Sequence, residues 1–189
     1  MIKVAFKDNF RQFQNIAISK DILLRQVIPE KDAKDFYDIY SDEDAFRYFG
    51  GYKKPGEFDD TFKKIISNRI RNFVNGRDYS WTIVFGDKAI GQIQLFDFQN
   101  SNTLAEVGYF MKREYWNKGI NTLVLKAVCN FAFETMKIKR IEAHAHINNI
   151  GSCRTLEKAG FVREGLLRQR FEVGNKYEDC YLYSLLNSD

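Results

Sequence analysis

The chain contains little proline and cysteine, no long apolar run and no long run of like charges. Only 2 of its 189 residues are proline and 3 are cysteine. Cys129, Cys153 and Cys180 are odd in number and lack the spacing of a metal site, so we expect free thiols in a reducing cytoplasm. No apolar run approaches the length of a membrane span, and the N-terminus lacks the apolar core of a signal peptide. These absences predict a cytoplasmic protein that does not enter a membrane.

Charged residues of both signs are distributed along the chain. The formal net charge is +4, and no basic run marks a nucleic-acid-binding surface. Hydrophobic residues make up 44% of the chain, which is typical of a globular protein with a sizeable core. We therefore expect a single domain over residues 22–189, with residues 1–21 as an N-terminal extension packed on it.

Hydrophobic periodicity predicts strands and helices in a mixed order. Alternating runs predict strands over residues 22–27, 79–85, 88–99, 104–111, 140–147, 166–173 and 176–185, the last two joined across Gly174-Asn175. Helical spacing predicts helices over residues 30–41, 59–75, 123–136 and 152–159, with a further helical turn after a cap at Ser41–Asp44. There is no internal repeat and no linker, so the pattern predicts one mixed α/β domain.

The segment Tyr115–Thr122 joins the strand predicted over residues 104–111 to the long helix predicted over residues 123–136. Free N–H groups at the start of a helix, together with the helix dipole, favour an anion there. Gly119 would let a ligand approach the backbone closely, and Lys118 adds positive charge. The residues alone leave two interpretations open, a phosphate site and an ordinary tight turn that needs a glycine.

Two segments of the chain together resemble the cofactor motifs of the GNAT acyltransferases. The first is Trp116-Asn117-Lys118-Gly119-Ile120-Asn121, and the second is Asn149-Ile150-Gly151-Ser152, followed by Leu156–Phe161 and Arg163–Gly165. Each falls at a predicted junction of strand and helix, and the resemblance covers residues 22–187. Leu24-Arg25 and Tyr183–Leu186 are similar to the subgroup of ribosomal-protein N-terminal alanine and serine acetyltransferases.

The resemblance implies a mixed central sheet, flanked by helices, that splays between the strands over residues 104–111 and 140–147. It also implies acetyl-coenzyme A (acetyl-CoA) as cofactor, with its pantetheine arm in the split and its diphosphate on the N–H groups of the loop. The implied cofactor-binding residues are Tyr109, Phe110, Met111, Asn117, Lys118, Gly119, Ile120, Asn121, Thr122 and Asn149. Asn121 departs from the family, which usually has Gly or Ala there, so we expect any altered diphosphate position at this residue.

Two residues are predicted to carry acetyl transfer from the thioester to an amine. The amine must lose a proton, and the leaving thiolate must gain one. Ser152, near a helix start, is the candidate that protonates the thiolate, because Leu156 stands where many relatives have a tyrosine for this role. Glu106 resembles the catalytic carboxylate of histone-type acetyltransferases and is the candidate base. The competing interpretations are a helix N-cap for Ser152 and a solvated strand residue for Glu106.

Three other patterns each have a functional and a structural interpretation. His144 and His146 share a strand face but lack a third ligand, so we expect a polar strand face and no metal. Cys153 suggests a covalent acyl-enzyme, but no partner is placed by motif and the family transfers the acetyl group directly. Seven acids within residues 30–44 either attract a cationic amine or form a solvated helix face.

The sequence therefore predicts an acetyl-CoA-dependent N-acetyltransferase that uses direct transfer. The acceptor is left open between a protein or peptide N-terminus and a small amine, such as a polyamine or an aminoglycoside. A non-catalytic acyl-CoA-binding sensor on the same fold is the alternative function. Monomer and homodimer are both left open.

Overall fold

The computed structural model describes residues 12–173 and 176–189. The strands are β1 (Ile16–Ala17), β2 (Ile22–Arg25), β3 (Tyr79–Phe85), β4 (Lys88–Gln99), β5 (Leu104–Met111), β6 (Arg140–His146), β7 (Val162–Val173) and β8 (Lys176–Leu186). The helices are α2 (Pro29–Tyr40), α3 (Glu43–Phe46), α4 (Asp60–Val74), α5 (Ile120–Glu134) and α6 (Ile150–Ala159). Two short 3-10 helices are η1 (Asn100–Asn102) and η2 (Arg113–Tyr115).

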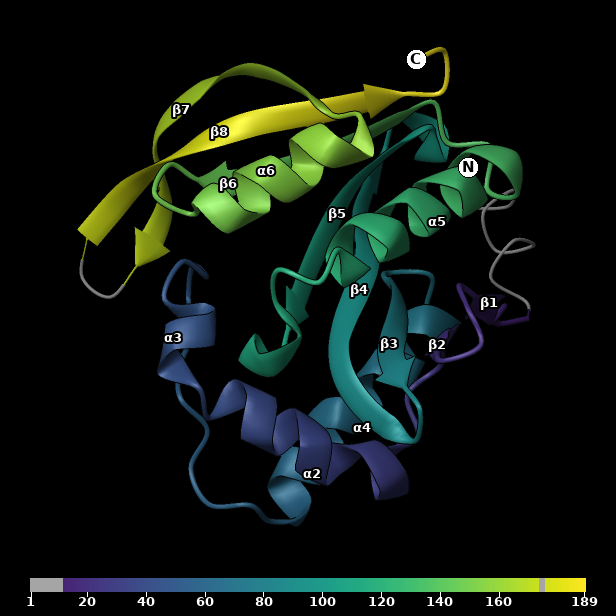
Figure 1. The fold of residues 1–189 in the computed structure, drawn as a ribbon, viewed down its shortest axis with the longest axis vertical. Coiled ribbons are helices and arrows are strands. Elements are labelled where there is room, and N and C mark those ends of the chain that lie inside the picture. Colours follow the sequence, from purple (N-terminus) through teal and green to yellow (C-terminus); the bar gives the residue numbers. More distant parts are fainter. Residues whose placement is uncertain (1–11, 174–175) are drawn as a thin grey trace.

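The described strands form one sheet in the order β1-β2-β3-β4-β5-β6-β8-β7, as Figure 1 shows. Neighbouring strands run antiparallel except β5 and β6, which are parallel. Helices cover both faces of the sheet, so the mixed α/β fold predicted from the sequence is confirmed.

The meander of β3, β4 and β5 begins and ends at the predicted residues, because clear alternation is bounded there by turns. The predicted helix starts were less accurate. α5 begins at Ile120 rather than at Leu123, since its N-cap is Gly119 and gives no Ser, Asp or Asn signal. α6 begins at Ile150, two residues before the predicted start at Ser152.

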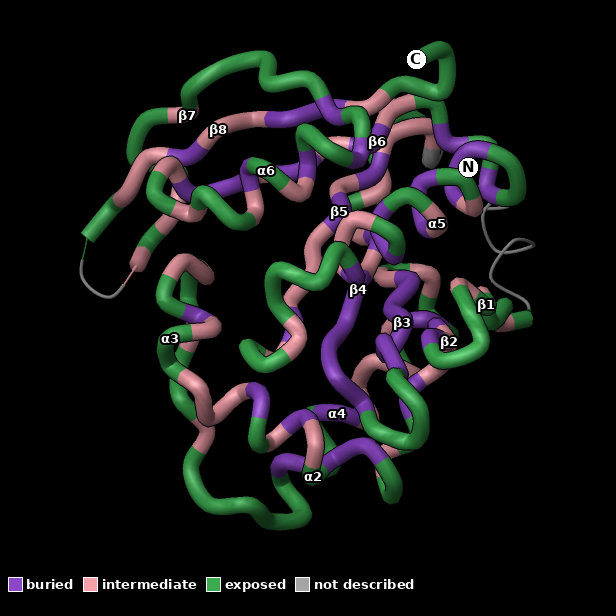
Figure 2. The backbone as a smooth tube through the Cα atoms, in the orientation of Figure 1, coloured by how far each residue is buried: buried purple, intermediate pink, exposed green. Residues whose placement is uncertain are grey.

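Each face of the sheet carries its own apolar core, and the buried residues follow the central strands in Figure 2. On one face α5 and α6 supply Leu125 and Leu156, and Tyr109 of β5 packs against that cluster. On the other face α2, α3 and α4 form a second cluster that includes Phe36, and Phe110 of β5 packs against it. Successive side chains of a strand point to opposite faces, which is why neighbouring residues of β5 reach different cores.

The parallel pair β5–β6 is the place where the sheet opens. Pairing extends only from Leu104, opposite Arg140, to Glu106, opposite Glu142. From Val107 onward β5 remains paired with β4 alone, so its other edge presents backbone groups without a strand partner. The predicted splay between these two strands is therefore confirmed.

The first described residues extend the sheet at its edge. β1 pairs with β2, and Phe13, Ile16 and Ile18 pack against the core under α5. Residues 1–11 and the predicted turn at Gly174-Asn175 lie outside the described residues, and the division into an extension and a domain stays a prediction. In the described part of the chain, no helix is both long enough and apolar enough to cross a membrane.

Candidate active site

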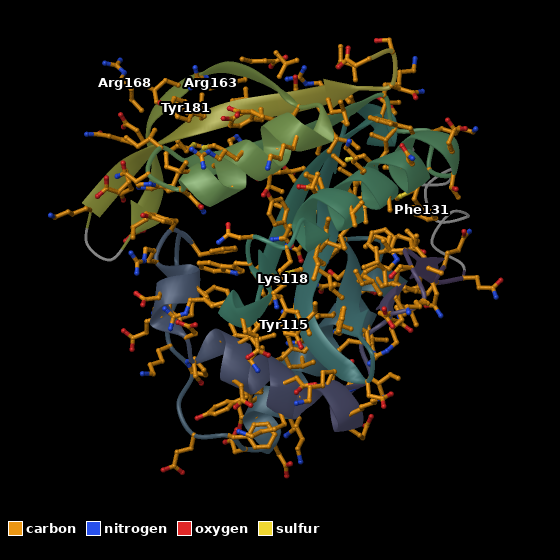
Figure 3. The ribbon with its side chains drawn as sticks, viewed as in Figure 1. Tyr115, Lys118, Phe131, Arg163, Arg168 and Tyr181 are labelled. Atoms are coloured by element: carbon orange, nitrogen blue, oxygen red, sulfur yellow. The ribbon has the colours of Figure 1, made fainter. Side chains whose placement is uncertain are left out.

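A cleft of about 1260 Å³ opens where β5 and β6 diverge. It is bordered by β4, β5 and β6, by the N-terminal ends of α5 and α6, and by residues 44–52 and 170–172. The predicted site residues that line it are Glu106, Tyr109, Phe110, Met111, Asn117, Gly119, Ile120, Asn121, Thr122, Asn149 and Ser152. Lys118 is not among the lining residues, and its ammonium lies 5.3 Å from the centre of the Tyr115 ring. Both residues are labelled in Figure 3.

The N-terminal end of α5 forms an open cradle of N–H groups. Gly119 is the N-cap, with φ +75° and no side-chain cap, and a Cβ built on it would meet no atom within 4 Å. Because α5 begins at Ile120, Ile120, Asn121 and Thr122 form its first turn, whose N–H groups have no partner inside the helix. A phosphate oxygen fits this arrangement, which supports the phosphate interpretation of the loop.

The loop before α5 is held by its own contacts. Asn117 has φ +59°, a left-handed conformation that Asn tolerates better than most residues. The indole N–H of Trp116 donates to the Met111 carbonyl at 2.6 Å. That carbonyl is therefore already engaged, and it is the N–H of Met111 that remains for a ligand in the split.

Asn121, which departs from the family pattern, has a buried side-chain oxygen, Oδ1, without a partner among the described residues. A buried amide oxygen without a partner costs about 1–3 kcal/mol. The residue that departs from the family pattern thus places an unpartnered amide oxygen in the first turn of α5.

The N-terminal end of α6 is organised by Asn149 and not by Ser152. The Asn149 side chain accepts a hydrogen bond from the Ser152 N–H at 3.1 Å, so Asn149 is the N-cap and the N-cap interpretation of Ser152 was wrong. The Ser152 hydroxyl instead lies 3.1 Å from the hydroxyl of Tyr109. Burial raises the pKa of Tyr109 to about 12, so this phenol keeps its proton at neutral pH. The sequence placed Tyr109 among the cofactor-binding residues and gave its hydroxyl no role in the proton transfers.

Glu106 and His144 form a pair at the closed end of the split. His144 Nδ1 lies 2.8 Å from Glu106 Oε1, and the two side chains are only 9% and 19% exposed. In the parallel register Glu106 lies opposite Glu142, so His144 is on the same face, one step toward the opening. That register is the signal which, read from the sequence, would have predicted the pair.

His146 and Cys153 make packing contacts. His146 stacks on Tyr48, with ring centres 4.7 Å apart. Cys153 is buried in the core under α6. Within the described ranges, no group of three or more His, Cys, Asp or Glu side chains is placed to hold a metal ion.

The acidic cluster of residues 30–44 is largely neutralised by partners within the chain. Asp32 is fully buried and makes two hydrogen bonds of 2.6 Å with Arg25. The other partnered acids are Asp35 with the Ala89 N–H, Asp38 with Lys34, Asp42 with Arg113 and the Ala45 N–H, Glu43 with Lys54, and Asp44 with Arg47 and Arg113. Most of these acids are therefore not free to bind a cationic acceptor.

The comparisons with known proteins agree with this architecture. Residues 21–162 match the family model described as an acetyltransferase (GNAT) domain. The probable N-acetyltransferase YjcK of Bacillus subtilis (strain 168) is 38% identical over 104 residues, which span 54% of this chain and 58% of YjcK. The putative ribosomal N-acetyltransferase YdaF of the same organism is 28% identical over 131 residues, 69% of this chain and 72% of YdaF.

A solved structure has the same fold. RimL, a ribosomal L7/L12 alpha-N-protein acetyltransferase in complex with coenzyme A, superposes with a TM-score of 0.82 at 16% identity. The superposition covers 92% of this chain and 98% of RimL. Since the family model matches most of the chain and the sheet splays as expected, this chain belongs to the GNAT family of N-acetyltransferases, whose acyl donor is acetyl-CoA.

Proposed function

We propose that this GNAT acetyltransferase transfers the acetyl group of acetyl-CoA directly to a primary amine, with Glu106 as the base and Ser152 as the acid. One observation carries the proposal. Two hydrogen-bonded pairs, Glu106 with His144 and Ser152 with Tyr109, line a single cleft. Glu106 and Tyr109 project to opposite faces of β5, so the two pairs approach the split from opposite sides.

The chain's residues fit acetyl-CoA, which supplies an activated thioester when bound. The free N–H groups of Ile120–Thr122 bind its diphosphate, and the open space at Gly119 admits the phosphate oxygens. The unpaired edge of β5 at Tyr109–Met111 aligns the pantetheine arm by backbone hydrogen bonds. Asn149 borders the arm on the side of α6.

The two side-chain pairs then carry the proton transfers. Glu106, oriented by His144, takes the proton that the amine nitrogen loses as the new C–N bond forms. The Ser152 hydroxyl gives a proton to the sulfur as the C–S bond breaks, and the neighbouring Tyr109 hydroxyl stabilises the serine oxygen by a hydrogen bond. A backbone N–H next to Phe110 on the unpaired edge of β5 is the proposed donor to the oxyanion, because the Phe110 N–H itself faces β4. The products are the N-acetylated amine and free coenzyme A.

The acceptor amine enters from the face of the sheet that carries Glu106. Residues 44–52 cover this side, and the Gly51 N–H donates to the Glu172 carbonyl at 3.1 Å across the cleft. A protein N-terminus and a small amine both remain candidates. The names of YdaF and RimL favour a ribosomal-protein N-terminus as acceptor for this chain as well.

A screen of amine acceptors with detection of the released thiol tests the proposal. The panel holds peptides with different N-termini, polyamines, aminoglycosides and amino acids. We expect thiol release that depends on one acceptor class. Binding of acetyl-CoA without release on any acceptor would instead favour the alternative, a non-catalytic acyl-CoA-binding sensor. Cytoplasmic location, and a monomeric or homodimeric state, stay predictions.

A further inference from the structure

At the end that borders Phe110 and Arg69, the cleft contains polar groups that the transfer chemistry does not use. Arg69 projects from α4 into the cleft, where one guanidinium nitrogen donates to the Tyr40 hydroxyl at 2.5 Å. Its guanidinium carbon lies 5.6 Å from the centre of the Phe36 ring. Its Nε is buried without a hydrogen-bond partner, and among the described residues Arg69 forms no ion pair with a carboxylate.

A second unpartnered group lies on the floor of the same cleft. Gln92 of β4 is only 3% exposed, and its Nε2 donates to Gln94 Oε1 at 2.7 Å. The Gln92 Oε1 is buried and accepts no hydrogen bond from any residue that the structure describes. Directly opposite on β3, the buried Thr82 hydroxyl also has no partner within residues 12–173 and 176–189. Three of the four such atoms in the described chain thus belong to Arg69, Gln92 and Thr82.

The strand register connects this end of the cleft to the proposed reaction centre. Gln92 lies opposite Phe110, Gln94 lies opposite Gly108, and Phe96 lies opposite Glu106. Side chains two residues apart on a strand share a face and are separated by about 7 Å. A row on one face of the sheet therefore leads from the unpartnered amide of Gln92 to the candidate base Glu106.

Arg69 is partly buried, and its surroundings leave its buried Nε without a polar partner among the described residues. Aromatic side chains form the wall above the strands, and Tyr40 and Phe46 stack with ring centres 4.8 Å apart. Leaving a buried polar group without a partner is unfavourable, and more so when the group is charged. A ligand carboxylate would satisfy the guanidinium.

We propose that the acceptor carries a carboxylate, which Arg69 binds while the amine several bonds away reaches the side of Glu106. The inference rests on the proposed function, because it takes Glu106 as the reaction centre. It favours an amino acid, or a peptide whose N-terminal residue has an acidic side chain, over a polyamine. A polyamine has no group for Arg69, and the acids of residues 30–44 that would attract it are mostly paired.

The test compares acceptors that differ only in the carboxylate. The free amino acids glycine, β-alanine, 4-aminobutyrate and 5-aminopentanoate are assayed beside their carboxamides, and Glu- and Asp-initiated peptides beside Gln- and Asn-initiated ones. The first series reports a free amino acid, and the second an acidic N-terminal residue. We expect the wild type to prefer at least one carboxylate over its amide by about 10- to 150-fold in kcat/KM, from one charged hydrogen-bonded contact.

Arg69→Gln and Arg69→Lys separate this contact from the chemistry. Arg69→Gln should lose the preference mainly through KM, and Arg69→Lys should restore part of it. Lys64→Gln removes an exposed charge from the same helix and is the matched control. Melting temperature and acetyl-CoA affinity report whether each variant is folded.

The outcomes distinguish the two proposals. Turnover of amines with equal use of acids and amides by the wild type would overturn this inference but leave the proposed function standing. A carboxylate preference retained in Arg69→Gln would also overturn it. If no amine is acetylated, the proposed function fails. The carboxylate inference is then decided by calorimetry, in which 4-aminobutyrate and the Glu-initiated peptide are titrated into the coenzyme A-saturated protein. Binding to wild type but not to Arg69→Gln supports the inference. Equal binding to both proteins, or no binding to either, overturns it.

Discussion

Ser152→Ala gives a sharp test of the proposed acid because it leaves the helix intact. The α6 cap uses the backbone N–H of Ser152 and the side chain of Asn149, and neither is changed by the substitution. What is lost is one hydroxyl that lines the cleft and that we propose as the proton donor to the thiolate. A hydrogen bond to a charged group contributes about 1.5–3 kcal/mol, so we expect kcat to fall about 10- to 150-fold.

Tyr109→Phe removes only the neighbouring hydroxyl, which lies 3.1 Å from the serine oxygen. One neutral hydrogen bond contributes about 0.5–1.5 kcal/mol, so we expect a fall in kcat of about 2- to 12-fold. Thiol release at saturating acceptor gives kcat, and calorimetry gives the acetyl-CoA Kd, which we expect to be unchanged in Ser152→Ala. Ser67→Ala, which removes an exposed hydroxyl from α4, is the control. A wild-type kcat in Ser152→Ala would refute the assignment.

Two further predictions concern the cradle and the far edge of the sheet. Gly119→Ala should lower the free energy of unfolding by about 1–2 kcal/mol, because alanine is strained at the positive φ of this residue. It should also weaken acetyl-CoA binding, measured by calorimetry, about 10-fold or more, since the added methyl group enters the open cradle. Arg140 lowers the pKa of Glu164 from 4.5 to about 2, so this pair stabilises the fold above pH 4.5 and its contribution is lost as the pH falls toward 2. Glu164 is partly exposed, so Glu164→Gln should lower the free energy of unfolding by only about 1 kcal/mol at pH 7. In denaturant titrations this difference from wild type should vanish near pH 2. A difference that stays constant with pH would contradict the linkage.

Local patterns predicted most of the fold. β3, β4 and β5 were predicted to the residue because alternation and turns are both local signals. β1 was missed because two residues carry no periodicity, and its strand character comes only from pairing with β2. β7 begins at Val162 rather than at Leu166, since its exposed first residues do not alternate in hydrophobicity.

The site residues likewise fall into those that local motifs predicted and those that only the tertiary structure brings together. The loop ending in Gly119 and the segment Asn149–Ser152 were visible in the sequence because each motif is contiguous. The contact between Glu106 and His144 joins positions 38 residues apart and depends on the parallel register of two strands. The place of Arg69 in the cleft likewise depends on how α4 packs against the sheet, which hydrophobic periodicity does not specify.

Acetyl transfer at the Glu106–His144 pair is tested by the kcat of Glu106→Gln. Glu142→Gln is the matched control, since Glu142 lies opposite Glu106 in the register but is bound to Arg140. A general base contributes about 100- to 10,000-fold, so we expect kcat to fall at least about 100-fold in Glu106→Gln, with the acetyl-CoA Kd unchanged and near-wild-type turnover in Glu142→Gln. Equal rates in the two variants would contradict the account.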